Sequence, residues 1–370
     1  MIPRKRMLVL CPFPYGVAAG QRLKYEQYFH RWRSNGWEIK ISPFMDDELW
    51  NVVYKRGHNI SKIGGVLRGH SRRLADLFKI PRYDLIYIFM YVTPFFTSFL
   101  ERLVRLLAKR VIYDIEDNIH NYQKSSSHIN PNPLVKFMKW PGKVQFLIQT
   151  ADHVITSSPF LNEECKKLNV AKACSYVSSS LDTDRYKTKS FYTHDQTVVI
   201  GWTGTYSSKE YLDQLKNIFL RLAKRVNFKL KVIGNFEYSL SGIDLEVVKW
   251  NLKNEIYDLQ SFDIGVYPLS IDKWVLGKSG LKAIQYMALG IPCVATEVGT
   301  TSMIITDKIN GRLVKSEDEW VDALEELVRN PKTRRKIGEQ ARRDAVANYS
   351  IHTIGHIYDK ILNEVINLKK

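Results

Sequence analysis

The sequence predicts an α/β protein built from two doubly wound, Rossmann-like domains with parallel sheets. Two observations lead to this prediction. Short apolar segments alternate with helical patterns, and strands joined through helices pair in parallel with helices on both faces of the sheet. The polar stretch 189–197 interrupts this alternation, and 370 residues are enough for two hydrophobic cores. We therefore place domains at 1–188 and 196–348 and a final helix at 349–370.

The first half contains the elements of one such domain. A helix is predicted through "RLKYEQYFHRWRSNG" (22–36), between the first two strands. The uncharged stretch 85–100 is shorter than a membrane span and contains Pro94, so we expect a buried strand followed by a helix there. The predicted strands are "MLVLCPF" (7–13), "EIKISPF" (38–44), "LIYIFM" (85–90) and "RVIYDIED" (110–117).

The second half repeats the pattern. A helix at "GLKAIQYMALG" (280–290) is expected to end at Gly290 and Pro292. The apolar spacing of residues 352–370 predicts the terminal helix. The predicted strands are "VVIGWTG" (198–204), "FKLKVIGNF" (228–236), "LEVVKWN" (245–251), "FDIGVYPL" (262–269) and "PCVATE" (292–297).

The net charge indicates the kind of partner, and the cysteine pattern indicates the cellular compartment. The net charge is +17, and residues 1–150 carry 24 Lys and Arg against 11 Asp and Glu. Such an excess favours an anionic partner, namely nucleic acid, an acidic membrane surface or a phosphorylated substrate, although solvated lysines would also produce it. The four cysteines form no CxxC pair and the N-terminus lacks a signal-peptide pattern, so we expect a cytoplasmic protein.

The loop after the first strand, "PFPYGVAAGQR" (12–22), has the composition of an anion site. Gly16 and Gly20 would let a ligand approach the backbone, and Arg22 and Lys24 would add positive charge to a helix N-terminus. An ordinary strand-to-helix turn is the alternative. The spacing is not GxGxxG, so a dinucleotide cofactor is not predicted.

Acidic residues gather in "RVIYDIEDNIH" (110–120). Asp114, Glu116, Asp117 and His120 are predicted just past an apolar strand, where crowded carboxylates can act as bases or bind sugar hydroxyls. A solvated acidic loop is the alternative, and a metal site is less favoured because no second ligand cluster accompanies it.

Two segments of the second half could hold a phosphate. In "IGWTGTYSSKEYL" (200–212), Gly204 and Thr205 end a strand and Lys209 follows, while Ser207 or Ser208 could simply cap a helix. In "GKSGLKAIQYMALGIPCVAT" (277–296), Lys278 precedes a helix whose first turns carry Lys282 and Gln285 on one side. A diphosphate at this helix N-terminus, with a ribose alongside, would fit these groups.

Together these segments resemble the family 4 glycosyltransferases of the GT-B fold, over nearly the whole chain. The family's glycine-rich first loop, its NGVDxxxF motif and its ExxxxxxxEAMAxGxPVVAT helix are similar to "PYGVAAGQR" (14–22), "SSLDTDRY" (179–186) and residues 277–296. A branch with the motifs GWxGSxxTxxYL, FDIGxxPL, GKxGxKxLQYMA and DIDD is the most similar.

The resemblance implies an arrangement and a reaction. Two domains would face a central cleft, the first holding the acceptor and the second the nucleotide sugar, with the C-terminal helix crossing back to the first domain. A sugar would pass from a nucleotide-diphosphate sugar to a glycan or lipid-linked acceptor with retention of anomeric configuration, in cell-envelope polysaccharide synthesis. No metal or other cofactor would be needed.

The resemblance also assigns residues. The family's paired glutamates fall on Gly277 and Gln285, so Gln285 would hold the ribose and Gly277 would leave the transferred sugar without its usual contact. The family's histidine falls on Glu116, and its usual arginine falls near Trp202. The predicted catalytic residues are Glu116, Asp117 and Lys278. The predicted nucleotide-sugar-binding residues are Gly16, Arg22, Gly204, Thr205, Lys209, Lys278, Gly280, Lys282 and Gln285.

Other functions remain open. The loss of both glutamates would suit an inactive GT-B protein that binds partners as a scaffold, and a nucleotide-sugar 2-epimerase shares the fold. Nucleic-acid binding is not predicted, because no recognition motif accompanies the charge. Residues 95–110 and 55–73 are basic and partly apolar, so they could attach the protein to the inner face of an anionic membrane. An ordinary crossover helix is the alternative for 95–110.

Overall fold

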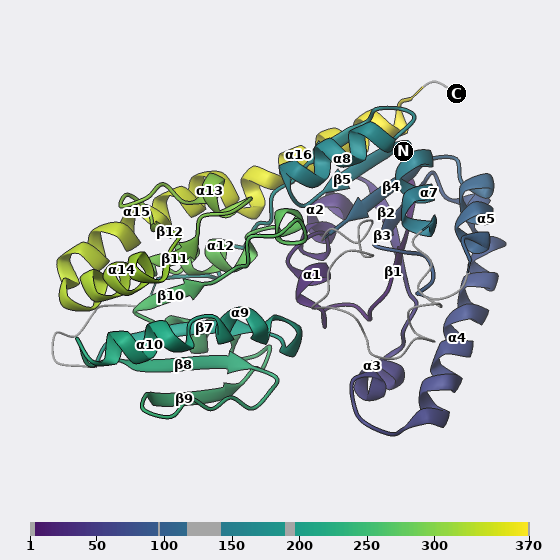
Figure 1. The fold of residues 1–370 in the computed structure, drawn as a ribbon. Coiled ribbons are helices and arrows are strands. Elements are labelled where there is room, and N and C mark those ends of the chain that lie inside the picture. The colour runs from purple at the N-terminus through teal and green to yellow at the C-terminus, as the bar shows by residue number, and fades with distance from the viewer. Residues whose placement is uncertain (1–3, 95–96, 117–141, 189–196, 369–370) are drawn as a thin grey trace. The chain divides into compact units, whose positions relative to one another are not determined.

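The computed structural model describes residues 4–94, 97–116, 142–188 and 197–368 (Figure 1). The chain forms two compact units, Met1–Ser178 together with Ile354–Lys370, and Ser179–Thr353. Each unit contains a six-stranded sheet in which every pair of neighbouring strands is parallel, with helices between most successive strands. The predicted fold class is confirmed.

The sheet of the first unit has the order β2-β1-β3-β4-β5-β6. The central strands Leu85–Phe89 and Val111–Ile115 are buried along their whole length, which explains why their sequences are apolar except for Asp114. The strands are β1 Lys5–Cys11, β2 Trp37–Pro43, β3 Leu85–Phe89, β4 Val111–Ile115, β5 His153–Thr156 and β6 Cys174–Tyr176. The helices are α1 Ala19–Arg22, η1 Glu26–Tyr28, α2 Phe29–Ser34, α3 Asp47–Val53, α4 Asn59–Leu77, η2 Ile80–Arg82, α5 Phe99–Leu107, α7 Gly142–Thr150 and α8 Pro159–Leu168.

The single helix predicted at 22–36 is wrong. The chain instead forms the short helices α1, η1 and α2, with a turn at Leu23–Tyr25. This turn directs Lys24 into the interior, where its ammonium pairs with Asp114. The helix is therefore interrupted at the position where Lys24 forms a buried ion pair.

The terminal helix α16 (Ile351–Ile366) returns to the first unit from Ile354 onward, as predicted. Tyr358 on this helix packs against Tyr28 and Trp32. Arg31 Nε donates a 2.7 Å hydrogen bond to Asp359. Aromatic packing and a charge-assisted hydrogen bond thus hold the helix to α2.

The sheet of the second unit has the order β12-β11-β10-β7-β8-β9. Gly201 and Gly265 leave no room for a side chain, because a Cβ would lie 2.0 Å from the ring of Phe262 and 2.4 Å from that of Tyr286, respectively. The strands are β7 Val199–Gly204, β8 Lys229–Gly234, β9 Asp244–Lys249, β10 Ile264–Tyr267, β11 Cys293–Thr296 and β12 Arg312–Val314. The helices are η5 Tyr206–Ser208, α9 Lys209–Asp213, α10 Lys216–Ala223, α11 Glu255–Gln260, η6 Val275–Gly277, α12 Leu281–Ala288, α13 Thr301–Ile304, α14 Glu317–Arg329 and α15 Pro331–Tyr349.

The uncharged stretch 85–100 forms β3 and the start of α5, which confirms the predicted strand and helix. Within the described ranges, the chain has no helix with the length and apolar character that a membrane crossing requires.

Candidate functional site

The candidate site of the second unit lies where α12 begins, at the edge of the sheet formed by the carboxyl ends of its parallel strands. Gly280 is the N-cap residue and has a left-handed backbone with φ of 72°. Thr300 Oγ1 donates a 2.8 Å hydrogen bond to the Lys278 carbonyl and so fixes the approach to the helix. No described side chain caps α12, so its first amide N–H groups lack a side-chain acceptor.

Replacing Gly280 with alanine should destabilise the second unit by about 1–3 kcal/mol. The added methyl would lie 2.3 Å from Ile304 Cδ1, and the left-handed backbone would be strained as well. Urea unfolding measures the loss. Gly242→Ala is the control, because Gly242 has φ of 84° but its nearest neighbour, Leu220, would be at 3.4 Å. An equal loss in both variants would show that the Ile304 contact is unimportant.

Lys282 is a half-buried cation held between aromatic rings. Its ammonium lies 4.6 Å from the centroid of the Trp202 ring and 5.6 Å from that of Tyr267. In the part of the chain that the structure describes, no carboxylate or hydrogen-bond acceptor pairs with this ammonium. Burial, followed by the charge of Lys278, lowers the pKa of Lys282 to about 7.

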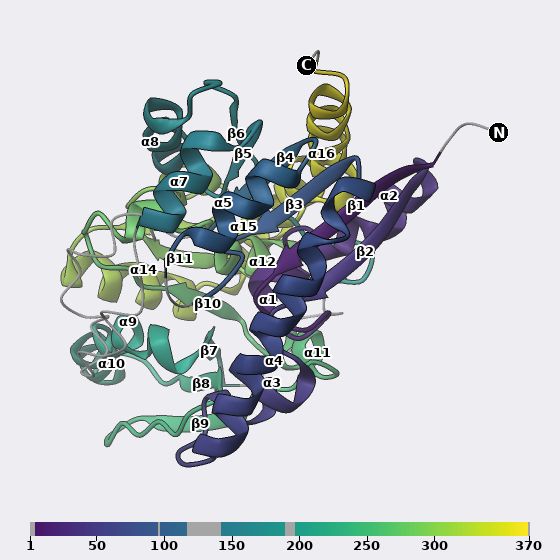
Figure 2. The same cartoon turned by 90° about the vertical axis from the view of Figure 1, so that its right-hand side faces the viewer.

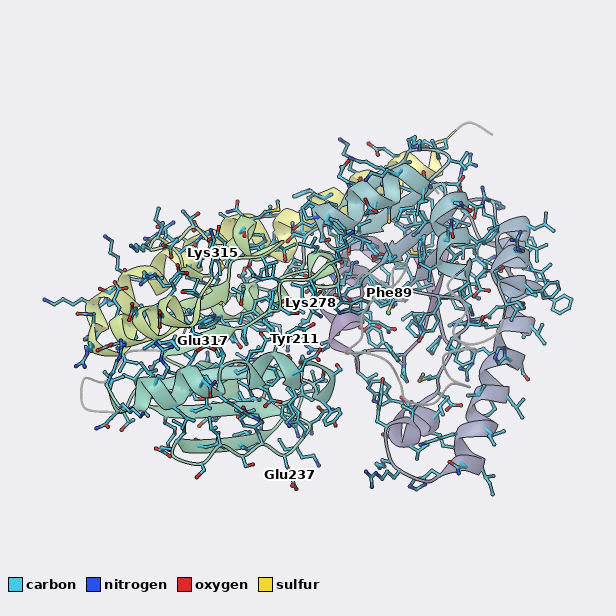
Figure 3. The ribbon with its side chains drawn as sticks, in the orientation of Figure 1. Phe89, Tyr211, Glu237, Lys278, Lys315 and Glu317 are labelled. Atoms are coloured by element: carbon cyan, nitrogen blue, oxygen red, sulfur yellow. The ribbon has the colours of Figure 1, made fainter. Side chains whose placement is uncertain are left out.

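Lys278 is the second cation here. Its ammonium lies 5.5 Å from the centroid of the Tyr211 ring, on α9, and Figure 3 labels both residues. Two lysines close enough for one to lower the pKa of the other, beside an uncapped helix N-terminus, form a region of positive potential. An anion bound at this place would stabilise all three groups.

In the loop after β7, side chains of the protein itself already accept hydrogen bonds from backbone N–H groups. Thr205 and Ser208 form a capping box over η5, and the Tyr206 N–H donates a 3.0 Å hydrogen bond to Asn235 Oδ1. The N-cap residue is therefore Thr205, and Ser208 contributes by accepting a 3.2 Å hydrogen bond from the Thr205 N–H. Gly204 ends β7, where a Cβ would lie 2.4 Å from the Trp202 ring and 2.6 Å from Ser208 Oγ.

Lys209 and Gln285, which were predicted to bind the same ligand as Lys278 and Lys282, contact other residues in the structure. Lys209 Nζ is 3.8 Å from Asp213 Oδ2 and 5.8 Å from the centroid of the Tyr238 ring. Gln285 is buried, and its amide donates a long 3.5 Å hydrogen bond to the Tyr186 hydroxyl.

The Tyr186 hydroxyl in turn donates a 3.3 Å hydrogen bond to Glu255. Arg342 donates hydrogen bonds of 2.7 and 2.6 Å to the carbonyls of Tyr186 and Ala288, and so ties the "SSLDTDRY" segment to the end of α12. Gly277 is buried as the last residue of η6, and its N–H donates to the Trp274 carbonyl at 3.1 Å.

In the first unit, the predicted anion loop binds a carboxylate of the protein itself. Gly16 has φ of 79°, and its N–H donates a 2.9 Å hydrogen bond to Glu26. Gln21 Nε2 donates to Glu26 at 3.0 Å and to the Phe13 carbonyl at 3.1 Å. Gln21 Oε1 accepts a 3.0 Å hydrogen bond from the Phe13 N–H. Burial raises the pKa of Glu26, and the Gly16 N–H, Gln21 and Arg22 lower it by less.

The structure brings Glu116 to the same loop. A Cβ on Gly20 would lie 2.6 Å from Glu116 Oε2, so glycine is required for the carboxylate to approach the backbone of α1. Asp117 and His120 lie outside the described residues. The sequence did not predict that Glu116 lies beside this loop, because the two segments are about a hundred residues apart in the chain.

Asp114 is not in the acidic loop, and that prediction is wrong. It lies inside β4 and is fully buried, with Oδ1 2.5 Å from Lys24 Nζ and a hydrogen bond from the Tyr87 hydroxyl. Burial raises the pKa of Asp114, while Lys24 lowers it by less. Lys24 is therefore occupied by a structural ion pair. The sequence signal was an acid inside an apolar strand, because a buried carboxylate requires a cation such as Lys24 nearby.

Comparison with known proteins agrees with the overall fold of the chain. A sucrose-phosphate synthase from Thermosynechococcus elongatus superposes with a TM-score of 0.71 at 14% identity, covering 98% of this chain and 100% of that one. The HepE protein of Anabaena, solved with UDP and glucose, gives a TM-score of 0.64 at 12% identity, with coverage of 98% and 100%. The chain has the GT-B fold.

The sequence of the chain also matches a glycosyltransferase family model and a curated glycosyltransferase, each over part of its length. Residues 187–344 match the family described as "Glycosyl transferases group 1", and this range includes Lys278, Lys282 and the whole of α12. A D-inositol 3-phosphate glycosyltransferase from Paenarthrobacter aurescens (strain TC1) is 42% identical over 64 residues. That match spans 17% of this chain and 16% of the relative.

Proposed function

We propose that this protein is a glycosyltransferase that moves a sugar from a nucleotide-diphosphate sugar to a glycan or lipid-linked acceptor. The observation that carries the proposal is Lys282, a half-buried ammonium without an anionic partner among the described residues, at the uncapped start of α12. A diphosphate supplies the missing charge. The family match over residues 187–344 supports the same class of reaction.

The chemistry follows from where charge develops. When the bond between sugar and diphosphate breaks, negative charge grows on the departing phosphate oxygens. Lys282, Lys278 and the first amides of α12 are already in place and can stabilise that charge more strongly in the transition state than in the ground state. Since two lysines supply positive charge, we propose that the reaction needs no bound metal.

The finer assignments belong to the same proposal. Retention of anomeric configuration and a role in cell-envelope polysaccharide synthesis rest on the motif resemblance. Glu116, beside Gly20, and Asp117 are proposed as the carboxylates of the reacting centre. Gly16, Arg22, Gly204, Thr205, Lys209 and Gln285 remain proposed donor contacts, and an internal partner would have to be displaced for Gly16 to bind a ligand through its amide.

The test is turnover with a panel of UDP-, GDP- and deoxysugar donors, followed as release of the nucleoside diphosphate with lipid and oligosaccharide acceptors. Transfer with one donor, lost in Lys278→Ala and Lys282→Ala, supports the proposal. A scaffold function is the second candidate, because Gly277 offers no side chain and Gln285 is engaged with Tyr186. Donor binding without turnover across the panel would favour it.

Donor affinity should fall as the pH rises. The free protein holds Lys282 with a pKa of about 7, and a bound diphosphate favours the ammonium, so binding takes up a proton near and above that pH. Above it, affinity is expected to fall by up to about tenfold per pH unit. A nucleotide sugar is the best probe, because its diphosphate diester does not titrate near neutral pH.

Calorimetry in buffers of different ionisation enthalpy measures this proton uptake directly. The Lys282→Met variant should bind weakly and without the pH dependence. Equal wild-type affinity at about pH 6 and about pH 8.5 would contradict a titrating lysine at the diphosphate.

A further inference from the structure

Helix α4 (Asn59–Leu77) has small and charged residues on its buried face. Gly65 and Gly69 lie against Leu49 and Phe44, where a Cβ would come within 2.8 and 2.7 Å of those side chains. Arg73 and Asp76 are buried below them and pair at 3.2 Å. Close backbone packing, an internal ion pair and Leu77, which packs on the core, therefore attach the helix, and most of its large apolar residues are not used for this purpose.

Those apolar residues point outward. They recur at helical spacing, so they form one stripe along the helix. The stripe consists of Ile60, Ile63, Leu67, Leu74 and Phe78, which are 89, 62, 62, 50 and 83% exposed. Scattered exposed apolar residues are normal, but a continuous line of five large ones marks an interaction surface. Figure 2 shows α4 facing the viewer along its whole length.

The surroundings of the stripe are cationic. Residues 54–82 contain a single acid, Asp76, which is buried. The basic residues of this range are Lys55, Arg56, Lys62, Arg68, Arg72, Arg73, Lys79 and Arg82. Arg68 pairs with Asp46 and Glu48 of the neighbouring segment. The side chains of Lys55 and Arg56 at one end of the stripe, and of Lys79 and Arg82 at the other, have no ion pair within the described ranges.

We propose that the α4 stripe lies on an anionic lipid surface, with the cations at its two ends on lipid headgroups. Apolar side chains entering the headgroup boundary beside Lys and Arg are the signature of an interfacial helix. Tyr54, 75% exposed next to Lys55, adds the amphipathic ring that such boundaries favour. A second copy of the chain fits less well, because it would bring one set of cations against another.

The neighbouring helix α5 fits this role less well, although residues 95–110 were also candidates. The cations of this segment contact the protein itself: Arg105 on α5 donates to the Thr150 carbonyl at 2.7 Å, and Lys109, just after the helix, pairs with Asp84 at 2.9 Å. Arg102 lies 4.6 Å from the centroid of the Phe146 ring. The proposal therefore assigns the membrane contact to α4, and it does not depend on sugar transfer.

Sedimentation with vesicles tests the proposal on the full chain. Wild-type protein should sediment with phosphatidylcholine–phosphatidylglycerol vesicles at low salt, and much less with phosphatidylcholine alone or at high salt. Ile60→Ser with Leu67→Ser should lower the partition coefficient by about tenfold or more. Lys55→Ser with Arg56→Ser should lower it by a similar factor and reduce the salt dependence. Val170→Ser with Tyr257→Ser is the matched control, since these residues are 81 and 77% exposed elsewhere.

Three outcomes would overturn the proposal. The first is wild-type protein that stays in the supernatant with anionic vesicles at low salt. The second is binding that the α4 variants leave unchanged. The third is a dimer in sedimentation velocity that the Ile60→Ser, Leu67→Ser variant abolishes, because a second copy would then cover the stripe. Donor turnover by soluble protein, measured separately, keeps this result distinct from the proposed function.

Discussion

Replacing Lys282 with methionine is expected to weaken binding of the donor nucleotide by about 30- to 100-fold, or about 2–3 kcal/mol. The variant loses the half-buried ammonium at the start of α12 but keeps an unbranched side chain that can pack on Trp202 and Tyr267. The fold should not suffer, because burial already disfavours the charged lysine. Calorimetry with nucleoside diphosphates measures the affinity, and urea unfolding checks the stability.

The control for this substitution is Lys315→Met. Lys315 belongs to the same unit and is labelled in Figure 3. Its side chain is 64% exposed and pairs with Glu297 at 3.3 Å. It should bind nucleotide as tightly as the wild type. If Lys282→Met does the same, the diphosphate does not lie at α12, and the phosphate assignment is wrong.

Replacing Lys24 with methionine is expected to cost about 3–5 kcal/mol of unfolding free energy. The reason is Asp114, which is fully buried in β4 and would lose the ammonium 2.5 Å from its Oδ1. A buried carboxylate without its cation must either stay charged at high cost or take up a proton. The deficit should therefore shrink as the pH is lowered, since burial already raises the pKa of Asp114.

Two controls accompany this prediction. Lys166→Met removes an exposed pair with Glu163 at 2.9 Å and should cost less than about 1 kcal/mol. The double variant Lys24→Met with Asp114→Asn should recover part of the loss, because no charge remains buried. Urea unfolding that finds Lys24→Met as stable as Lys166→Met would show that the pair is not structural.

The fold could be predicted from the sequence because alternation of strands and helices is a local signal. The buried strand β3 appears as a continuous apolar run, β4 as an apolar run interrupted only by Asp114, and α12 begins and ends at glycines. The failure at 22–36 has a long-range cause. The turn there serves Asp114, about ninety residues away in sequence, and no local pattern reveals that a lysine will be drawn inward.

The candidate site could be predicted only in part for the same reason. Spacing within one segment placed Lys278 and Lys282 at a helix start. The rings beneath Lys282 come from β7 and β10, which become neighbours only through the strand order of the sheet. Likewise, Glu26 reaches Gly16 because the chain turns after α1, so a loop that resembles an anion site is already bound to a carboxylate.

The outward stripe of α4 shows a further limit. Its apolar spacing is equally consistent with a helix packed on a core, and only the exposure of Ile60, Ile63 and Leu67 shows which way the stripe points. The close glycine contacts on the opposite face explain that orientation.

A crystal structure with a bound nucleoside diphosphate tests the central claim most directly. We predict that the diphosphate oxygens lie within hydrogen-bond distance of Lys282 Nζ and of the first amides of α12, with Lys278 beside them. A diphosphate held instead by the loop after β7 and Lys209, with Lys282 still stacked on Trp202 and out of contact, would contradict it.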